Sequence, residues 1–338
     1  ILDEPTNHLD FKTLMWLEGY LKTYRGAIII VSHDRYFLDK ICTKICEIEN
    51  GRITAFRGNY SDYVLQKEQL TARQMKEYEA QQREISQLED YIARNKVRAS
   101  TAKMAKSRQH MLDRMEVIDR PAAAERPPKI KLDYSIEPTK DVVQVIDCPL
   151  TVGEGNSAKT LIEDLTIKVR RGEHVAIIGD NGTGKTTILK LINELVEPDA
   201  GTIRLGSKVQ IGYYDQEHHV LHPDKTLFEE ISDEYPSLNN TEIRNTLAAF
   251  LFTGDDVFKR IKDLSGGERG RVSLAKLMLS ESNFLILDEP TNHLDIASKE
   301  ILEDAVNAYE GTVLYVSHDR YFINRTASRI LELSGGQL

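Results

Sequence analysis

The feature that most constrains the fold of this chain is a repeat of two segments at one offset. The decapeptide ILDEPTNHLD at Ile1–Asp10 recurs at Ile286–Asp295, and VSHDRYF at Val31–Phe37 recurs at Val316–Phe322. Both offsets (286 minus 1, and 316 minus 31) are 285 residues. A shared offset predicts one domain type that occurs twice. Most of that domain precedes the repeated segments of the second copy and nothing precedes those of the first, so we expect a fragment of a longer two-domain protein.

A phosphate-binding motif lies in the second copy. Gly179–Thr186 reads GDNGTGKT, which fits G-x-x-x-x-G-K-[ST], and it joins an apolar strand at His174–Ile178 to an apolar helix at Thr187–Ile192. Its glycines let backbone N–H groups turn toward phosphates at a helix N-terminus. Lys185 is then expected on the β- and γ-phosphates, and the Thr186 hydroxyl on Mg²⁺.

A pair of carboxylates follows a second apolar strand. Phe284–Leu287 is followed by Asp288 and Glu289. An acid pair is often only a solvated loop, but the strand and the verbatim repeat argue against that here. Asp288 is expected to hold Mg²⁺, and Glu289 to orient or deprotonate an attacking water.

The segment Leu264–Glu268, LSGGE, precedes a helical apolar pattern. By itself it is an ordinary helix N-cap, yet a hydroxyl and bare N–H groups also make an anion site. The chain order of Lys185, Ser265, Asp288 and His318 favours the anion site.

Together these residues resemble the ATP-binding cassette ATPase domain. The resemblance implies an α/β P-loop NTPase fold, with the second copy nearly complete, only the C-terminal part of the first, and a helical hairpin between them. It implies ATP and Mg²⁺ as ligands, with two cassettes sandwiching two nucleotides head to tail. The catalytic residues implied are Glu289, His318, Glu4 and His33. The metal-binding residues implied are Thr186, Gln216 and Asp288, with Asp3 in the first cassette. The ATP-binding residues implied are Gly179, Asp180, Asn181, Gly182, Thr183, Gly184, Lys185, Thr186, Thr187, Gln216, Ser265, Gly266, Gly267 and Glu268.

Two departures within this resemblance matter. The loop after each catalytic glutamate reads NHLD, at Asn7–Asp10 and Asn292–Asp295, where transporter cassettes typically carry SALD. EPTNHLD twice in one chain resembles the ABC-F subfamily. The family usually stacks adenine on an aromatic residue before the P-loop, and Val152 stands there, which leaves the base preference open.

The segment between the copies predicts an antiparallel helical hairpin. Apolar residues repeat at helical spacing in two stretches, first Met75, Tyr78, Ile85, Leu88 and Ile92, then Met104, Met111, Met115 and Ile118. Pro121, Pro127 and Pro128 end the hairpin. The expected boundaries are residues 1–60 for the first cassette part, 61–120 for the hairpin, 121–140 for a Pro-rich connector and 141–338 for the second cassette.

Charge is unevenly distributed over this hairpin. The whole chain has a net charge of −9, whereas residues 94–114 carry seven bases and one acid, so the tip is about +6. A basic helix end is usually just solvated, but a lone basic tip on an acidic protein favours contact with RNA phosphates. The small residues Ala99–Ala102 and Ala105 are expected to let the backbone approach RNA closely. The expected RNA-binding residues are Arg94, Lys96, Arg98, Lys103, Lys106, Arg108 and Arg114.

In ABC-F proteins the hairpin occupies the ribosomal exit-tRNA site and touches the peptidyl-site tRNA. The resemblance therefore implies an ATP-switched translation factor that binds the ribosome, its rRNA and its tRNA. Two alternatives are a soluble ATP-binding subunit of an ABC transporter and a DNA-processing ATPase. The translational step, and any role in antibiotic resistance, stay open.

Three cysteines and no apolar run near the ~18 residues of a membrane span favour a cytoplasmic protein without membrane insertion. Neither ATP site is expected to be completed within the chain. Each is expected to need the missing part of the first cassette, or a second copy of the chain by dimerisation.

Overall fold

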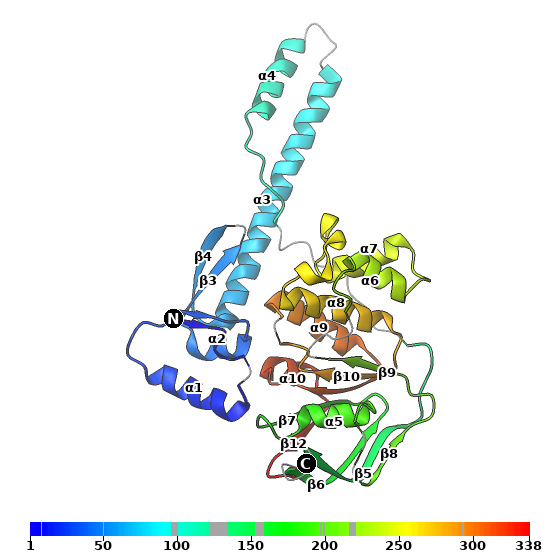
Figure 1. The fold of residues 1–338 in the computed structure, drawn as a ribbon. Coiled ribbons are helices and arrows are strands. Elements are labelled where there is room, and N and C mark those ends of the chain that lie inside the picture. The colour runs from blue at the N-terminus through cyan, green and yellow to red at the C-terminus, as the bar shows by residue number, and fades with distance from the viewer. Residues whose placement is uncertain are drawn as a thin grey trace. The chain divides into compact units, whose positions relative to one another are not determined.

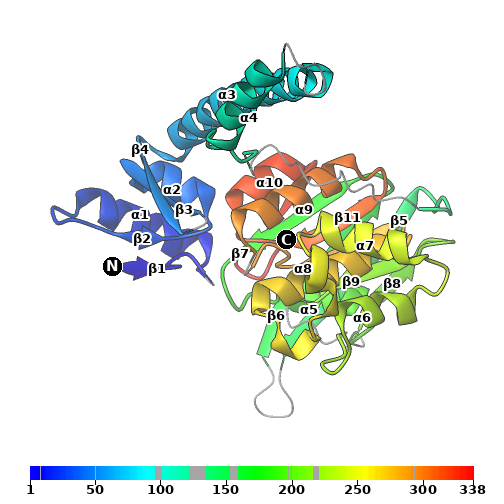
Figure 2. The ribbon, with the colours of Figure 1, turned by 90° about the horizontal axis from the view of Figure 1, so that it is seen from above.

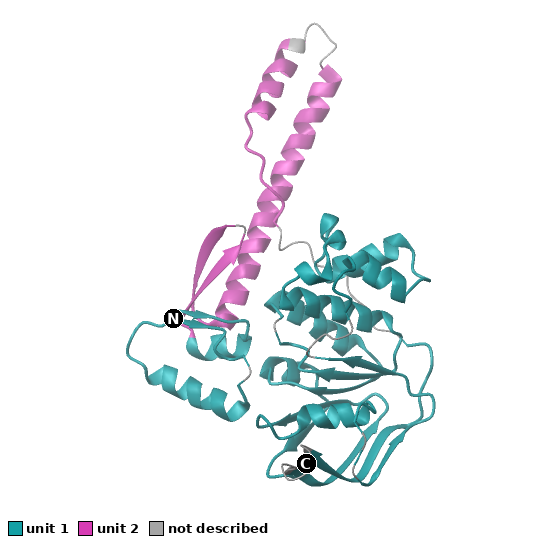
Figure 3. Cartoon of the chain, viewed as in Figure 1, with its two compact units in different colours: residues 1–41, 127–338 teal, residues 42–126 magenta. Residues whose placement is uncertain are grey.

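The computed structural model describes residues 1–7, 9–49, 51–95, 101–121, 134–152, 159–196, 198, 200–215, 221–292 and 294–338. It divides into two compact units (Figure 3). One contains residues 1–41 and 127–338, and the other contains residues 42–126. None of the described helices is long and apolar enough to cross a membrane.

A five-stranded parallel sheet forms the centre of the first unit. Its strand order is β12-β7-β11-β10-β9, with bounds Arg329–Leu333, His174–Gly179, Thr312–Val316, Phe284–Asp288 and Ile211–Tyr214. Every residue of β10 and β11 is buried, as expected for inner strands of a parallel sheet covered on both faces. The carboxyl ends of β7 and β10 therefore deliver the P-loop and the Asp288–Glu289 pair to one edge of the sheet.

The two faces of this sheet carry separate apolar cores. Leu285 and Leu287 of β10 point into one core, and Phe284 and Ile286 point into the other. The second core also takes in α5 and a three-stranded antiparallel sheet, β6-β5-β8. The bounds are Lys185–Ile192 for α5, Asp141–Val152 for β5, Lys159–Arg170 for β6 and Thr202–Leu205 for β8.

The first core is built with the remaining helices of the second copy, which lie on the face opposite α5 (Figure 1). They are α6 (Leu227–Glu234), α7 (Asn240–Ala249), η3 (Gly254–Phe258), η4 (Ile261–Asp263), α8 (Gly266–Leu279), α9 (Ile296–Ala308) and α10 (Arg320–Thr326). The mixed α/β fold of a P-loop NTPase cassette is therefore confirmed.

The first copy contributes a smaller piece to the same unit. Its strands β1 (Leu2–Asp3) and β2 (Ile30–Val31) pair in parallel, as do their equivalents β10 and β11. Helices α1 (Phe11–Thr23) and α2 (Arg35–Ile41) lie beside them (Figure 2). Leu14, Leu21 and Phe37 form the buried core of this piece.

The second unit holds a β-hairpin and a helical hairpin. Strands β3 (Lys44–Glu49) and β4 (Arg52–Arg57) pair antiparallel, and α3 (Tyr60–Asn95) runs alongside α4 (Ala102–Asp113). The α3 stripe is confirmed, since Leu88 and Ile92 are buried. The amide of Gln81 ties the two arms together, donating to Glu116 O at 2.7 Å and accepting from Ile118 N at 2.7 Å.

The prediction for the second arm is wrong in two respects. Helix α4 ends at Asp113, so Met115 and Ile118 lie beyond it, and Met104 and Met111 are exposed. Ala105 is buried at 3 % exposure instead, because a small residue allows the close approach of α3. Ala105 therefore does not offer backbone to an RNA.

Candidate functional site

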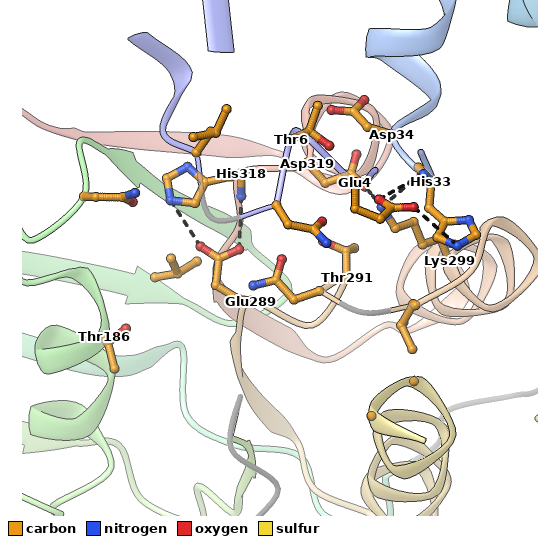
Figure 4. Close-up of a pocket in the computed structure, with 18 of the residues that line it drawn as sticks. Glu4, Thr6, His33, Asp34, Thr186, Glu289, Thr291, Lys299, His318 and Asp319 are labelled. Atoms are coloured by element: carbon orange, nitrogen blue, oxygen red, sulfur yellow. Dashed lines mark hydrogen bonds and ion pairs between the residues drawn. The ribbon is translucent and has the colours of Figure 1, made fainter. Parts of the chain in front are cut away.

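A cavity of about 880 Å³ in the first unit brings the predicted site residues together (Figure 4). Both copies of the repeat line it, the first with Glu4 and His33 and the second with Glu289 and His318. The P-loop and the LSGGE segment line the same cavity with Asn181, Gly182, Gly184, Lys185, Thr186, Thr187, Ser265, Gly266, Gly267 and Glu268.

The P-loop joins the end of β7 to the start of α5, as its sequence predicts. Gly184 has a φ of +102°, and a Cβ there would lie 2.7 Å from Leu150 Cδ2, so this N-cap position requires glycine. The Lys185 ammonium donates to Gly179 O at 2.9 Å and Asp180 O at 2.8 Å, so it lies across the loop. Burial lowers the pKa of Lys185.

Thr186 and Asp288 form the part of the site that fits Mg²⁺. The Thr186 hydroxyl donates to Asp288 Oδ1 at 3.2 Å, while Asp288 Oδ2 is buried with no hydrogen-bond partner among the described residues. Burial, with a smaller contribution from Asp215, raises the pKa of Asp288 to about 6. A divalent cation would supply the charge that this buried carboxylate lacks, and a hydroxyl and a carboxylate are ligands of the kind Mg²⁺ prefers. Gln216 lies outside the described residues.

Glu289 and His318 form a buried pair at the carboxyl ends of β10 and β11. Glu289 Oε2 accepts from His318 N at 3.2 Å, and Oε1 lies 3.4 Å from His318 Nε2. Burial, followed by the charge of Asp288, raises the pKa of Glu289 to about 7. Burial and the charge of Lys185 lower the pKa of His318 to about 4. The imidazole is therefore neutral at pH 7, and the carboxyl changes charge near that pH.

The same geometry recurs in the first copy. Glu4 Oε2 accepts from His33 N at 3.3 Å, and Oε1 lies 3.6 Å from His33 Nε2. The two glutamates even share a left-handed backbone, with φ of 41° at Glu4 and 47° at Glu289. The first pair is more open to solvent, since the His33 side chain is 46 % exposed and that of His318 is 16 % exposed. Asp3 ends β1, is exposed and does not line the cavity, so its metal role stays a prediction.

The LSGGE segment is both a helix cap and a cavity wall. Ser265 Oγ accepts from Glu268 N at 3.3 Å, and Glu268 Oε2 accepts from Ser265 N at 2.8 Å, which is a capping box at the start of α8. The Ser265 N–H bond lowers the pKa of Glu268. The anion-binding role of this segment stays a prediction.

Two residues at the site were missed by the sequence reasoning: Lys299, which lines the cavity, and Asp10, which bonds to the P-loop. Asp10, the last residue of the first NHLD loop, accepts from Thr13 N at 2.9 Å as N-cap of α1 and from Asn181 N of the P-loop at 3.3 Å. Lys299 on α9 donates to His33 O at 3.2 Å and to Asp319 Oδ2 at 3.0 Å. The repeat of NHLD is a signal for Asp10, whereas no motif marks Lys299 and the first copy has no lysine at the equivalent position.

The predicted RNA-binding residues belong to the second unit. The described members, Arg94, Lys103, Lys106, Arg108 and Arg114, are all exposed. The Arg108 guanidinium lies 5.7 Å from the Tyr91 ring centroid. Lys96 and Arg98 lie outside the described residues, as does the side chain of Val152.

Two family models match the chain, both described as ABC transporter. One covers residues 162–292 and the other residues 46–132. Among solved structures, the dimeric post-hydrolysis state of the ATP-binding cassette MJ0796 bound to ADP and Pi matches with a TM-score of 0.50. That match has 22 % sequence identity and covers 58 % of this chain and 96 % of MJ0796, so it supports the fold alone.

Curated relatives match over the whole chain. YdiF of Bacillus subtilis is 51 % identical over 100 % of this chain and 52 % of its own length. ABC transporter F family member 5 of Arabidopsis thaliana is 41 % identical over 100 % of this chain and 50 % of its own length. ATP-binding protein Uup of Escherichia coli is 37 % identical over 99 % of this chain and 53 % of its own length. The chain thus spans about half the length of the curated relatives it matches.

Proposed function

Because the chain belongs to the F family of ATP-binding cassette proteins, we propose that it binds and hydrolyses ATP as a translation factor acting on ribosomes in the cytoplasm. The observation that carries the ATP part is the single cavity shared by Lys185, the Thr186–Asp288 pair and the Glu289–His318 pair. The ribosome part draws on family membership and on the exposed bases of α3 and α4.

The residues of the cavity have complementary tasks in hydrolysis. Lys185 and the P-loop N–H groups bind the phosphates, and His318, uncharged at pH 7, contacts the γ-phosphate. Water attacks the γ-phosphorus as the bond to ADP breaks, and Glu289 accepts the proton that the water loses. Mg²⁺ bound by Thr186 and Asp288 would neutralise charge on the phosphates.

The second ATP site and full turnover involve more than this cavity. By the head-to-tail arrangement of the family, each P-loop faces the LSGGE segment of the other cassette. We expect the remaining part of the first cassette, or a second copy of the chain, to be required for rapid turnover. The bond from Asn181 N to Asp10 supports this arrangement, since it places an NHLD loop of one copy on the P-loop of the other.

The ribosome role is an ATP switch. ATP binding would favour the closed cassettes, and the closed cassettes would favour the conformation that docks on RNA. Hydrolysis would end this preference, because ATP has a different affinity for the closed and the open state. Exposed bases on a chain of net charge −9 suit contact with rRNA and tRNA phosphates.

The test uses the full-length protein with Glu4→Gln and Glu289→Gln together, so that ATP binds without being hydrolysed. Sedimentation with 70S ribosomes, at a stated salt concentration, should show binding with ATP and not with ADP. Neutralising Lys103, Lys106 and Arg108 should weaken this binding, whereas neutralising the exposed bases Arg170, Arg204 and Lys208 of the first unit should not. Absence of ribosome binding with either nucleotide would refute the translation role and favour a transporter subunit, to be sought in membrane fractions.

A further inference from the structure

The two copies of the repeat contact each other through a reciprocal set of ion pairs. Arg35 from the first VSHDRYF segment binds Glu303 on α9 with both terminal nitrogens, one of them at 3.3 Å. Arg320 from the second VSHDRYF segment binds Glu18 on α1. Both the arginines and the glutamates are 285 residues apart (320 minus 35, and 303 minus 18), so the two contacts are equivalents related by the repeat.

Each arginine also stacks on a tyrosine of the opposite copy. The Arg35 guanidinium carbon lies 3.9 Å from the Tyr321 ring centroid, and that of Arg320 lies 4.1 Å from the Tyr36 ring centroid. The tyrosines obey the same offset. A planar guanidinium suits this position because it can stack on a ring and bind a carboxylate edge-on at once.

These contacts are largely removed from water. The side chains of Arg35 and Glu303 are 2 % and 0 % exposed, and those of Arg320 and Glu18 are 16 % and 11 % exposed. Glu303 also accepts from Arg325 of its own copy at 2.9 Å, so the loss of one member should leave an uncompensated charge chiefly in the Arg320–Glu18 pair. Because neither pair forms within one copy, the interaction can exist only when the two copies meet.

Lys299 connects this contact to the loops that carry the switch histidines. Its ammonium donates to the carbonyl of His33 in one copy and to the carboxylate of Asp319, the residue after His318, in the other. Asp319 in turn caps α10, accepting from Phe322 N at 3.0 Å. At the equivalent position the first copy has Leu14, which is buried in its apolar core.

We propose that Arg35, Arg320 and Lys299 are positioning residues that set the two switch-histidine loops against each other when the cassettes meet. We call the set of Arg35, Glu303 and Tyr321 with Arg320, Glu18 and Tyr36 the arginine clamp. The clamp holds α1 and α9 to the opposite VSHDRYF segments, and Lys299 links the two loops from one side only. The existence of the clamp is independent of the proposed function, but its effect on hydrolysis rests on it.

A double-mutant cycle on the full-length protein tests the clamp. Glu18→Met and Arg320→Met should each raise hydrogen exchange over residues 11–23 about tenfold, and the double variant should raise it about tenfold rather than a hundredfold. The matched control is the same cycle on Arg329 and Glu173, 3.2 Å apart within the second copy, which should leave residues 11–23 unchanged. Unchanged exchange in the single variants, or additive effects in the double variant, would overturn the clamp. If Arg320→Met does not fold, Arg320→Lys, which keeps the charge and loses the planar fork, takes its place in the cycle.

Hydrolysis gives a second readout, through Lys299. Lys299→Met should lower kcat about tenfold with an unchanged KM for ATP, because the ammonium is engaged by His33 O and Asp319 and orients these loops, and Lys299→Arg should restore most of the activity. Lys168→Met is the matched control: it removes a lysine that bonds to Asp141 at 2.9 Å and does not line the cavity, and it should change neither constant. An equal rise in KM, or no change at all, would refute the positioning role. If the wild-type protein does not hydrolyse ATP, the proposed function is refuted instead. The hydrogen-exchange experiment would still show whether the arginine clamp exists.

Discussion

The ionisation of Glu289 leads to a quantitative prediction about the folding stability of the protein. Burial raises the pKa of this carboxyl from 4.5 to about 7 in the nucleotide-free protein. In the unfolded chain the carboxyl loses its proton near 4.5, so between about pH 4.5 and 7 the folded state binds more protons than the unfolded state. Stability contributed by this group is therefore lost as the pH rises through that window.

The size of the effect follows from the shift. A difference of about 2.5 pKa units corresponds to about 3 kcal/mol of folding free energy, fully lost above pH 7. Glu289→Gln removes the ionisation and keeps the shape, so it should stabilise the protein at pH 8 by about 3 kcal/mol and much less at pH 5. For a domain of this size, that corresponds to about 6 °C or more in Tm.

The assay is thermal unfolding of wild type and Glu289→Gln at pH 5 and pH 8, without nucleotide or Mg²⁺. The same variant at pH 5 is the control for any effect of the amide that does not depend on charge. An equal gain in Tm at the two pH values would show that the stabilisation does not come from ionisation. A loss of stability at pH 8 would show that the carboxylate is well stabilised in place, and would refute the reasoning from burial.

Three further predictions follow, two from the geometry of the cavity and one from the packing of the helical hairpin. Lys185→Met should weaken ATP binding at least about 100-fold, measured by titration with a fluorescent nucleotide, because it removes the ammonium that lies across the P-loop; an unchanged Kd would place the phosphates elsewhere. Thr186→Val should raise the Mg²⁺ concentration that gives half-maximal ATPase rate, since the hydroxyl on Asp288 is lost; an unchanged Mg²⁺ dependence would remove Thr186 from the metal site. Ala105→Glu should destabilise the helical hairpin by about 2 kcal/mol or more in urea unfolding followed by circular dichroism, because a charge would enter the α3–α4 contact, while Met104→Glu on the exposed side should be tolerated; equal effects of the two would contradict the described packing.

The sequence was most informative where a local pattern fixes a local geometry. Gly179–Thr186 predicts a strand–loop–helix because the spacing of its glycines suits only that turn, and the structure has it between β7 and α5. The repeat likewise predicted that Glu4 would resemble Glu289, and the bonds that they accept from the backbone N–H of the following histidine, His33 or His318, agree to within about 0.1 Å.

Sequence reasoning failed where the outcome depends on contacts between distant segments. The methionine stripe predicted which face of α4 is buried, yet the close approach of α3 selected Ala105, because packing depends on the space available and not only on hydrophobicity. Arg35 and Glu303 are 268 residues apart, so no periodicity or spacing pairs them. The arginine was visible inside a repeated motif, but its partner was not.

The repeat also shows where the two copies cannot be equivalent. The carboxylate–histidine geometry and the arginine clamp occur in both copies. The shared sequence is sufficient to explain why both sites adopt the same conformation. Lys299 occupies the position that Leu14 has in the first copy, so its ammonium, which bonds to Asp319 and to the carbonyl of His33, has no counterpart there. Despite burial, Lys299 helps hold the pKa of Asp319 below its usual value, while burial raises the pKa of Asp34, the equivalent residue. The two equivalent carboxyls therefore have pKa values shifted in opposite directions, although their motifs are identical. A chain with two identical motifs therefore presents two chemically different switch loops, and we expect the two ATP sites of the protein to respond differently to nucleotide.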